Sequence, residues 1–332
     1  MACDCDYVLG KHDVTEEHYS NCSSLLNGRE SKRNADGTLN LPNKNLSKMD
    51  VDFLYHLSID TANFDLPAMF GDVKFVVMGG TKHRMREFAC YIATILGLPQ
   101  DSKPVNLTKA SQRYAMYKVG PVLSVNHGIG NPSMTTVLQE VIKLMYYAKA
   151  KDPMFIRLGT SGGLGIPPGS VVISTFGLSG TLEKSFELTV LGVKRTWPSY
   201  LDKRLSEELV TAASEFKEFK TYAAASMGAN DFYLGQGRLD GPLCDYSEAD
   251  KMEYLNKLTS LGVRNIEMEV MAFAAITSEA GVRAGIACVT FVDRLKGDQV
   301  TIPKAVLNEW QKHPMFIVGA FIKKYVENRN KH

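Results

Sequence analysis

The sequence has no hydrophobic run long enough to cross a membrane, because no apolar stretch approaches the roughly 20 residues of a spanning helix. It also has no excess of charge of one sign, since 38 Lys and Arg stand against 36 Asp and Glu in 332 residues. The formal charge of +2 gives no general attraction to nucleic acid or to an anionic membrane. Neither partner is therefore expected.

Cysteine pairs with metal-binding spacing are also absent from the sequence. The 6 cysteines show no CxxC spacing of a zinc site, and so few in a long chain do not make a disulfide framework. The segment Met1–Asp6 carries acids where a secretory signal carries positive charge, and no apolar core follows it. Reduced thiols and a cytoplasmic location are expected.

Residues 1–50 contain no Phe, Ile or Trp and show neither helical nor strand periodicity. This composition predicts a polar, mobile leader. From residue 51 onward, short β-branched runs alternate with amphipathic helices, without a linker, an internal repeat or a low-complexity tract. The pattern predicts one α/β domain over residues 51–332, built around a largely parallel sheet.

Hydrophobic periodicity places the individual elements. A helix after Gly80 would bury Met85 and Ile92, and Asn131-Pro132 has the N-cap and N1 chemistry of a second helix start. We predict strands over residues 73–78, 121–125, 154–158, 171–174, 262–266 and 284–292. We predict further helices over residues 202–218, 248–261, 268–280 and 303–327.

Three glycine-rich turns each follow a predicted strand, at Gly79-Gly80, His127–Gly130 and Gly159–Gly163. In open α/β sheets, ligands bind outside the carboxyl ends of strands, where such turns converge. Glycine lets backbone N–H groups approach an anion, and Arg84 and Arg157 beside these turns could bind it in bidentate fashion. None of the turns has the Walker or the GxGxxG pattern. The residues leave two alternatives open, an oxyanion site or simple tight turns.

The segment Asp231–Gly241 reads DFYLGQGRLDG, and the glycines on both sides of Gln236 disfavour a helix and predict a shaped loop. Gln236 offers an acceptor and two donors, and Arg238 offers a planar fork of donors. Together they could bind a ring with adjacent carbonyl and N–H groups, such as a pyrimidine. A solvated polar loop is the alternative.

The segment Ile266–Glu269 places two acids, Glu267 and Glu269, between a predicted strand and an apolar helix. A carboxylate there can accept hydrogen bonds from both hydroxyls of a ribose. The alternative is an acid that the helix dipole favours at a helix start.

Several phrases of the sequence resemble, in the same order, those of animal-type uridine phosphorylases, which belong to the nucleoside phosphorylase family. They are the strand ending in Gly79-Gly80 with Arg84 after it, RYAMYKVGPVLSV, SVNHGIG, RLGTSGG, DFYLGQGRLDG and GVRNIEME. The resemblance covers about residues 51–325. It implies a three-layer α/β/α sandwich around a mixed, largely parallel sheet. It also implies reversible phosphorolysis of uridine to uracil and ribose 1-phosphate, with phosphate as co-substrate and neither cofactor nor metal.

The resemblance assigns roles to residues that match the family's motifs. Those implied to bind phosphate are Gly80, Arg84, Arg113, Arg157 and Thr160. Those implied to bind the nucleoside are His56, Thr160, Gly162, Phe232, Gln236, Arg238, Glu267, Met268, Glu269 and Arg294. Those implied to be catalytic are Arg84, Arg157, Gln236 and Arg238.

The implied nucleoside contacts are specific. Phe232 would stack on the base, and Gln236 and Arg238 would bond its carbonyls and N3–H. Glu269 would hold the ribose through its hydroxyls, and Arg294 would contact the uracil side.

Two implied roles need a second copy of the chain. Arg113 resembles an arginine that reaches the phosphate of the neighbouring subunit, and His56 resembles a histidine that crosses to the ribose 5′-hydroxyl. The resemblance thus implies a homodimer with shared active sites. Leu54, Leu57 and Phe64 are expected to bury that contact.

The sequence departs from the family pattern beside the implied ligands, at Asn131, Leu234, Val270 and Met271. Asp293 stands near the point where purine-cleaving relatives use an aspartate. Rate and preference among uridine, deoxyuridine, thymidine and purine nucleosides therefore stay open. Alternatives of another class are a silent nucleoside-binding paralogue and a hydrolytic nucleosidase, which would have no use for the phosphate arginines.

Overall fold

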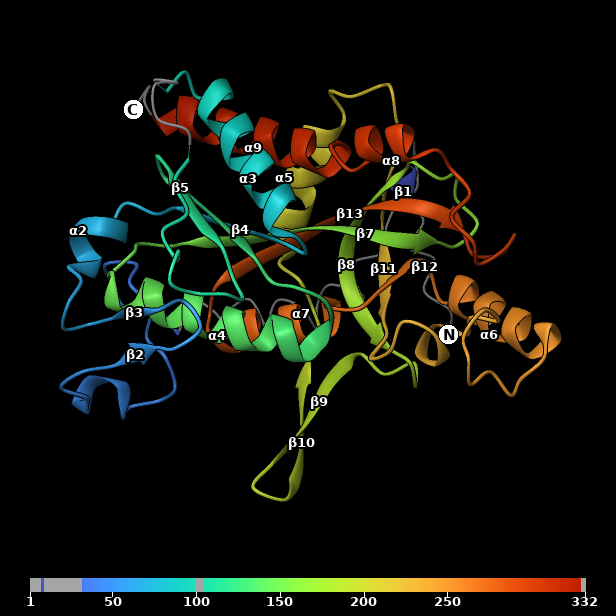
Figure 1. Cartoon of the computed structure of the whole chain (residues 1–332), viewed down its shortest axis with the longest axis horizontal. Coiled ribbons are helices and arrows are strands. Elements are labelled where there is room, and N and C mark those ends of the chain that lie inside the picture. Colours follow the sequence, from blue (N-terminus) through green and yellow to red (C-terminus); the bar gives the residue numbers. More distant parts are fainter. Residues whose placement is uncertain (1–6, 9–31, 99–103, 330–332) are drawn as a thin grey trace. The chain divides into compact units, whose positions relative to one another are not determined.

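The computed structural model describes residues 7–8, 32–98 and 104–329 (Figure 1). The described chain divides into two compact units. Unit 1 contains residues 7–8, 158–275 and 285–321, and unit 2 contains residues 32–157, 276–284 and 322–329. Whether the two units act as the one domain that the sequence suggests stays a prediction.

Unit 2 is built on buried hydrophobic strands. In β4 (Phe75–Gly79) and β6 (Val122–Asn126) every residue is buried, as expected for parallel strands covered on both faces. Helices α3 (Lys82–Ile95) and α4 (Gly130–Tyr147) lie on opposite faces of this sheet (Figure 1). The remaining elements of this unit are η1 (Leu46–Lys48), β2 (Phe53–Leu54), β3 (Ile59–Asp60), α2 (Leu66–Phe70) and β5 (Met116–Val119).

Unit 1 is organised around β11 (Thr221–Gly228), which pairs in parallel with β8 (Val171–Ser179) and with β12 (Val263–Glu267). β13 (Arg283–Asp293) runs antiparallel to β8, and β12 runs antiparallel to the end of β7 (Met154–Gly163). Strands β7 and β13 both begin in unit 2 and end in unit 1. The other elements with residues in this unit are β1 (Tyr7–Val8), α5 (Lys203–Ala213), η2 (Leu234–Gln236), α6 (Glu248–Ser260), α7 (Val270–Glu279), α8 (Lys304–Trp310) and α9 (His313–Arg329).

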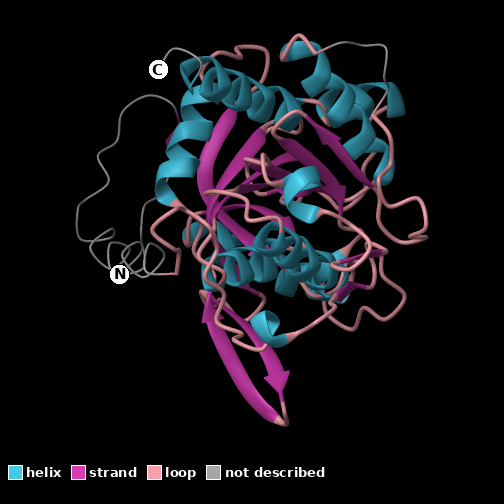
Figure 2. Cartoon of the chain, turned by 90° about the vertical axis from the view of Figure 1, so that its left-hand side faces the viewer, coloured by secondary structure: helices cyan, strands magenta, loops and turns pink. Residues whose placement is uncertain are grey.

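The sheets contain more antiparallel pairing than the alternation of strands and helices predicted. Strands β5 and β6 form a hairpin, because Gly120 with φ +50° and Pro121 make a two-residue turn. Strands β9 (Ser185–Val190) and β10 (Val193–Pro198) form a second hairpin that extends away from the sheet of unit 1 (Figure 2). The sequence analysis missed this hairpin.

The sequence analysis also missed β11, which reads TYAAASMG. Alanine has little preference for strands, so the segment carries no local strand signal. The strand is stabilised by parallel neighbours on both sides instead. One hydrophobic cluster joins β11 to α6 and β12: Leu255 and Leu258 of α6 pack with Met227, Val263 and Ile266.

Three predicted helices differ clearly from the observed ones, and the helix predicted over residues 202–218 ends at Ala213. Helix α4 begins at Gly130 with Ile129 as its N-cap, so Asn131 lies inside the first turn and does not cap the helix. Pro132 is tolerated there because N–H groups of the first turn have no intrahelical acceptor. The predicted helix over 303–327 is broken between Trp310 and His313 into α8 and α9.

Part of the predicted leader is packed against the rest of unit 2. Leu39, Leu41 and Leu46 are buried, and Arg33 Nη1 contacts Asp152 Oδ1 at 2.6 Å. These leucines therefore pack although they form no periodic pattern, and the domain boundary at residue 50 stays a prediction. Residues 1–6 and 9–31 of the predicted leader lie outside the described residues, and its mobility stays a prediction.

Candidate active site

Two of the three predicted glycine turns lie side by side in unit 2. Gly79 ends β4 opposite Asn126, the last residue of β6. The N–H of His127 donates to Gly79 O at 2.8 Å, and the N–H of Gly128 donates to Gly80 O at 3.1 Å. The carboxyl ends of two parallel strands thus meet at one edge, as the sequence predicted.

Arg84 extends over the first of these turns. It lies in the first turn of α3, where its N–H donates to the side chain of the N-cap Thr81 at 3.2 Å. A Cβ added to Gly80 would lie 3.3 Å from Gly128 O and 3.9 Å from Arg84 Nη1. The structure therefore brings together Gly80 and Arg84, and a side chain at position 80 would narrow the space between them.

The third glycine segment is not a turn, and this prediction is wrong. Gly159–Gly163 continues β7 to its end. A Cβ on Gly162 would lie 2.8 Å from Arg294 Cγ, and one on Gly163 would lie 3.1 Å from Ile166 Cγ1. These glycines permit close packing of neighbouring side chains in unit 1. Thr160, from the same strand, is half-buried.

Arg157 precedes this segment in β7 and belongs to unit 2. Its side chain is only 2% exposed, which places it among the largest fully buried side chains of the described chain. A buried guanidinium needs hydrogen-bonding and charge compensation to be stable. Arg113, by contrast, is exposed, so the predicted phosphate arginines occupy very different environments.

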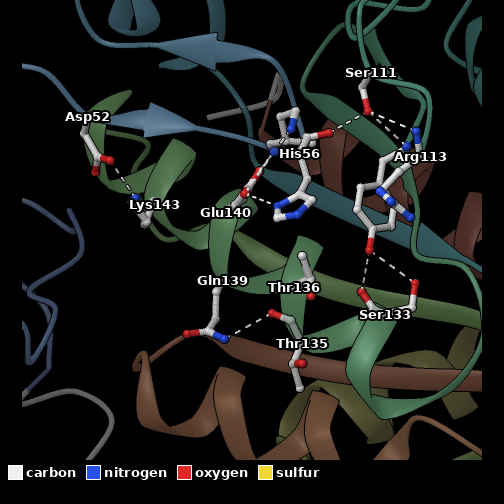
Figure 3. A network of polar contacts seen from close by, with 12 residues as sticks. Asp52, His56, Ser111, Arg113, Ser133, Thr135, Thr136, Gln139, Glu140 and Lys143 are labelled. Carbon is white, nitrogen blue, oxygen red and sulfur yellow. Dashed lines mark hydrogen bonds and ion pairs between the residues drawn. The ribbon is translucent and has the colours of Figure 1, made fainter.

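His56 and Arg113 belong to one polar network in unit 2 (Figure 3). Ser111 Oγ donates to His56 O at 2.6 Å and lies within 3.3 Å of the N–H of Arg113. The carboxylate of Glu140 contacts His56 Nδ1 at 2.7 Å. We call His56, Ser111, Arg113, Tyr114 and Glu140 the His56 network.

The His56 network is tied to the glycine turns. Tyr114 OH donates to Ser133 O at 3.0 Å, and Ser133 Oγ donates to His127 O at 2.6 Å. Because His127 is bonded to Gly79, a continuous set of hydrogen bonds joins the His56 segment to the Gly80 turn. All of these groups belong to unit 2.

In unit 1, Arg238 is held in a fixed position. Its Nε and Nη2 each donate to the Asp240 carboxylate at 2.8 Å, and Nη2 also donates to Asp298 O at 2.8 Å. The guanidinium lies over the Phe232 ring at 4.6 Å, while that ring remains 46% exposed. The bidentate bond from Asp240 raises the pKa of Arg238, and the same bond lowers the pKa of Asp240.

Gln236 and Arg294 meet beside this arginine. Arg294 Nη2 donates to Gln236 O at 2.8 Å, and Nη1 lies 3.4 Å from Gln236 Oε1. Gln236 is 5% exposed and Arg294 is fully buried, so these two side chains are withdrawn from solvent although most of the segment around Gln236 is exposed. The structure thus brings together the predicted base-binding side chains.

Asp298 is the buried anion that supports these arginines. Its Oδ1 contacts Arg294 Nε and Lys251 Nζ at 2.9 Å each, and its Oδ2 accepts from Leu239 N at 3.0 Å. Burial alone would raise a carboxyl pKa, but the Leu239 N–H, Lys251 and Arg294 outweigh it and lower the pKa of Asp298. We call Gln236, Arg238, Asp240, Arg294 and Asp298 the base cluster.

The two acids of the IEME segment have different surroundings. The Glu267 carboxylate accepts from Glu269 N at 3.0 and 3.1 Å and from Val270 N at 2.6 Å, where α7 begins. The bonding of Glu267 supports the helix-start alternative for this residue, and its predicted nucleoside contact is untested. Glu269 is also buried, and Met268 between them is half-buried.

Two of the residues that depart from the family pattern, Val270 and Met271, have packing roles. Cβ atoms added to Gly177 and Gly228 would lie 2.7 Å from Met271 Sδ and 2.5 Å from Met271 Cγ, so these glycines accommodate the bulky Met271 beside Val270. Asp293 Oδ1 accepts from Gly165 N at 3.0 Å and from Leu295 N at 3.2 Å. Asp293 therefore has a structural function that requires no purine.

The sequence analysis missed the carboxylates that position the candidate ligands, namely Glu140, Asp240 and Asp298. Only Glu140 left a usable signal, because it shares the buried face of α4 with Val137 and Leu144. An acid at a buried helical position indicates a hydrogen-bonded role.

The described residues contain no group of three His, Cys, Asp or Glu side chains suited to a metal ion. Within the same residues, no helix is long and apolar enough to span a membrane. Among the described cysteines, Cys90, Cys244 and Cys288 form no disulfide bond. The cysteines at positions 3, 5 and 22 lie outside the described residues.

Comparison with known proteins agrees with these features. The sequence model of the phosphorylase superfamily matches residues 74–323. The chain is 47% identical over 290 residues to uridine phosphorylase 1 of Mus musculus, covering 87% of this chain and 93% of that protein. It is 43% identical over 290 residues to the uridine and thymidine phosphorylase of Caenorhabditis elegans, covering 87% and 97%.

Structural comparison leads to the same group. The crystal structure of uridine phosphorylase from Schistosoma mansoni in complex with uracil matches with a TM-score of 0.81 at 39% identity. The match covers 85% of this chain and 98% of that chain. The predicted fold class, an α/β sandwich with a mixed sheet, is confirmed.

Proposed function

The chain belongs to the phosphorylase superfamily, and on that premise we propose that it catalyses the reversible phosphorolysis of uridine to uracil and ribose 1-phosphate. It is a pentosyltransferase of the uridine phosphorylase type. The observation that carries the proposal is the base cluster, in which a buried amide lies beside two fixed guanidinium groups. Such an arrangement suits a pyrimidine with adjacent carbonyl and N–H groups.

The base cluster accounts for leaving-group activation. As the glycosidic bond breaks, negative charge develops on the uracil carbonyls. Gln236 and Arg238 donate to those oxygens, while Gln236 Oε1 accepts from N3–H. Because Asp240 and Asp298 already fix Arg238, the donors need no reorganisation when charge develops. Phe232 contacts the face of the base.

The phosphate arginines supply positioning. Arg84 and Arg157 bind the phosphate dianion with Gly80 and Thr160, so that its oxygen can attack C1′ of the ribose. Glu269 holds the ribose hydroxyls, and charge-assisted bonds to phosphate are strong enough to fix both reactants. The nucleophile is phosphate itself, so no protein nucleophile and no cofactor enter the proposed reaction.

The proposed enzyme is a homodimer, in which His56 and Arg113 serve the partner's site. The surface near His56 supports this, because Phe53 and Tyr55 are 49% and 77% exposed and Phe64 is 38% exposed. Leu54 and Leu57 were expected in the contact, but both are fully buried within the chain. Alternation along the β2 segment turns Leu54 inward and its neighbours outward.

A cytoplasmic location completes the proposal. The free thiol of Cys90 is exposed, and an exposed free thiol fits a reducing compartment.

The deciding experiment measures uracil release from uridine with and without inorganic phosphate. We expect release that requires phosphate and produces ribose 1-phosphate. Release without phosphate would identify a hydrolytic nucleosidase. Uridine binding without release would identify a silent paralogue. Deoxyuridine and thymidine belong in the same assay, because one relative is named for both uridine and thymidine.

A further inference from the structure

We infer that Glu140 is a positioning residue for His56: it fixes the imidazole in one orientation, with its proton on Nδ1, and so presents Nε2 as an acceptor for a substrate hydroxyl. The inference rests on the proposed function, which gives His56 the ribose 5′-hydroxyl. It adds a residue that sequence reasoning did not select, and a direction for the hydrogen bond.

Glu140 holds the His56 segment through the backbone as well as the ring. The N–H of His56 donates to both carboxylate oxygens, at 2.9 and 3.0 Å, and the N–H of Leu57 donates at 3.0 Å. The same carboxylate contacts His56 Nδ1 at 2.7 Å (Figure 3). Glu140 is only 8% exposed, so these bonds form in a largely dry environment where each is strengthened.

The carboxylate determines the tautomer. An ionised carboxylate accepts hydrogen bonds and cannot donate one. A neutral imidazole bonded to it must therefore carry its proton on Nδ1, which leaves a lone pair on Nε2. The nearest cation on α4, Lys143, is bonded to Asp52 at 2.8 Å rather than to Glu140.

The main chain of His56 is fixed by hydrogen bonds, while its imidazole ring remains accessible to a ligand. His56 O accepts from Ser111 Oγ at 2.6 Å, so the main chain is fixed on both sides of the residue. The His56 side chain nevertheless stays 41% exposed, while that of Glu140 is 10% exposed. A ligand hydroxyl can therefore reach the ring while Glu140 remains out of reach.

The test compares two substrates, uridine and 5′-deoxyuridine, which lacks the hydroxyl in question. The measured quantity is the ratio of kcat/KM for uridine to kcat/KM for 5′-deoxyuridine, at a mildly alkaline pH where imidazole is neutral. One neutral hydrogen bond changes this ratio by about threefold to tenfold. We expect His56→Ala to bring the ratio close to one. We expect Glu140→Gln to lower it by about threefold or more through uridine alone, because the amide N–H₂ would move the ring proton to Nε2.

Asp52→Asn is the matched control. It makes the same acid-to-amide change at a 3% exposed carboxylate that also contacts α4, through Lys143 and Tyr147. We expect it to leave the ratio unchanged. Nitrogen NMR shifts of the His56 ring in the full-length chain give an independent readout, with the Nδ1–H form expected in the wild type and the Nε2–H form in Glu140→Gln.

The outcomes separate the inference from the proposed function. An unchanged ratio in Glu140→Gln, together with a lost ratio in His56→Ala, overturns the positioning role and leaves the function intact. An Nε2–H tautomer in the wild type also overturns the inference, even if the chain proves inactive. An unchanged ratio in His56→Ala overturns both the 5′-hydroxyl contact and the inference that depends on it.

Discussion

The base cluster of unit 1 and the His56 network of unit 2 are built differently. In the base cluster, Arg238, Arg294 and Asp298 are all less than a tenth exposed, and both arginines donate hydrogen bonds to Asp298. In the His56 network, only Glu140 and Tyr114 are buried, while Arg113 is exposed. The same chemistry, an arginine or histidine fixed by a carboxylate, thus occurs once inside a unit and once near its surface.

This difference indicates how recognition is divided. A buried, preformed cluster discriminates strongly, because any mismatched ligand leaves buried polar groups without partners. A half-exposed network contributes fully to ligand binding only when a ligand or another protein surface shields it from water. We therefore expect changes in the base cluster to affect specificity and stability, and changes in the His56 network to affect activity in a manner that depends on assembly.

The largest effect on activity is expected from Arg157→Ala. This change tests whether unit 2, like unit 1, contains a buried and preformed binding group. Loss of two charge-assisted bonds to phosphate costs about 3–6 kcal/mol, or about a hundredfold or more in kcat/KM for phosphate. Steady-state kinetics over a range of phosphate concentrations measures this. Far-UV circular dichroism and Arg157→Lys serve as controls for folding. A fall of less than about fivefold at saturating uridine would contradict the assigned role.

The second effect is on stability and comes from Asp298→Asn. Removing this carboxylate leaves Lys251 and Arg294 buried without their shared anion, which costs about 3–5 kcal/mol of unfolding free energy. Denaturant unfolding measures it, with Asp52→Asn as the matched change in unit 2. Equal destabilisation by both changes would contradict the cost assigned to the buried cations, because Lys143, the partner of Asp52, is 25% exposed whereas Lys251 is 5% exposed.

The contribution of Asp298 to stability can also be measured in the wild-type chain, by lowering the pH. Because the pKa of Asp298 is lowered in the folded chain, its stabilisation is fully present above the unfolded value of about 4. It is lost as the pH falls through the lower folded value. Wild type should therefore lose stability over this acid range, and Asp298→Asn should lose less of it. Parallel curves for both proteins would contradict this assignment.

The third effect is on base specificity. Cytosine places a donor at C4 and an acceptor at N3, so the base cluster should reject cytidine by about thirtyfold or more. Asp240→Asn removes the carboxylate that holds Arg238, and we expect it to reduce the discrimination about tenfold. Parallel assays with uridine, cytidine and inosine measure it. Inosine outrunning uridine would contradict the pyrimidine assignment.

The sequence predicted those parts of the site that depend on residues close to one another along the chain. The hydrophobic run of β4 and its terminal Gly79-Gly80 lie as expected before the helix that carries Arg84. The carboxylate partners could not be predicted in this way. Glu140 meets His56 across 84 residues, and Arg294 meets Gln236 across 58 residues. Only the folded arrangement pairs residues so far apart.

The same physical reason explains the missed strand β11 and the misplaced turn at Gly159–Gly163. The alanines of β11 become strand because β8 and β12 flank them. The glycines of β7 were interpreted by their own flexibility, but Gly162 is required by the side chain of Arg294 from a distant segment. Residues whose roles come from packing against remote neighbours carry no local signal.

The smallest effect is expected from Ser111→Ala, which sharpens the comparison at one hydrogen-bonding group. Ser111 Oγ donates to His56 O at 2.6 Å and lies 3.2 Å from the N–H of Tyr114. It touches no substrate in the proposed reaction, so its loss should lower activity only through the positions of His56 and Arg113. His56 stays bonded to Glu140, and Tyr114, the residue after Arg113, stays bonded to Ser133. We therefore expect a fall of about twofold to threefold. The fall should be larger at enzyme concentrations where sedimentation shows the dimer beginning to dissociate, since the network would be covered only in the dimer. The contrary outcome is a fall in activity that does not depend on enzyme concentration, in a chain that is fully active as a monomer. It would mean that the His56 network is complete within one chain. The network would then differ from the base cluster in exposure alone.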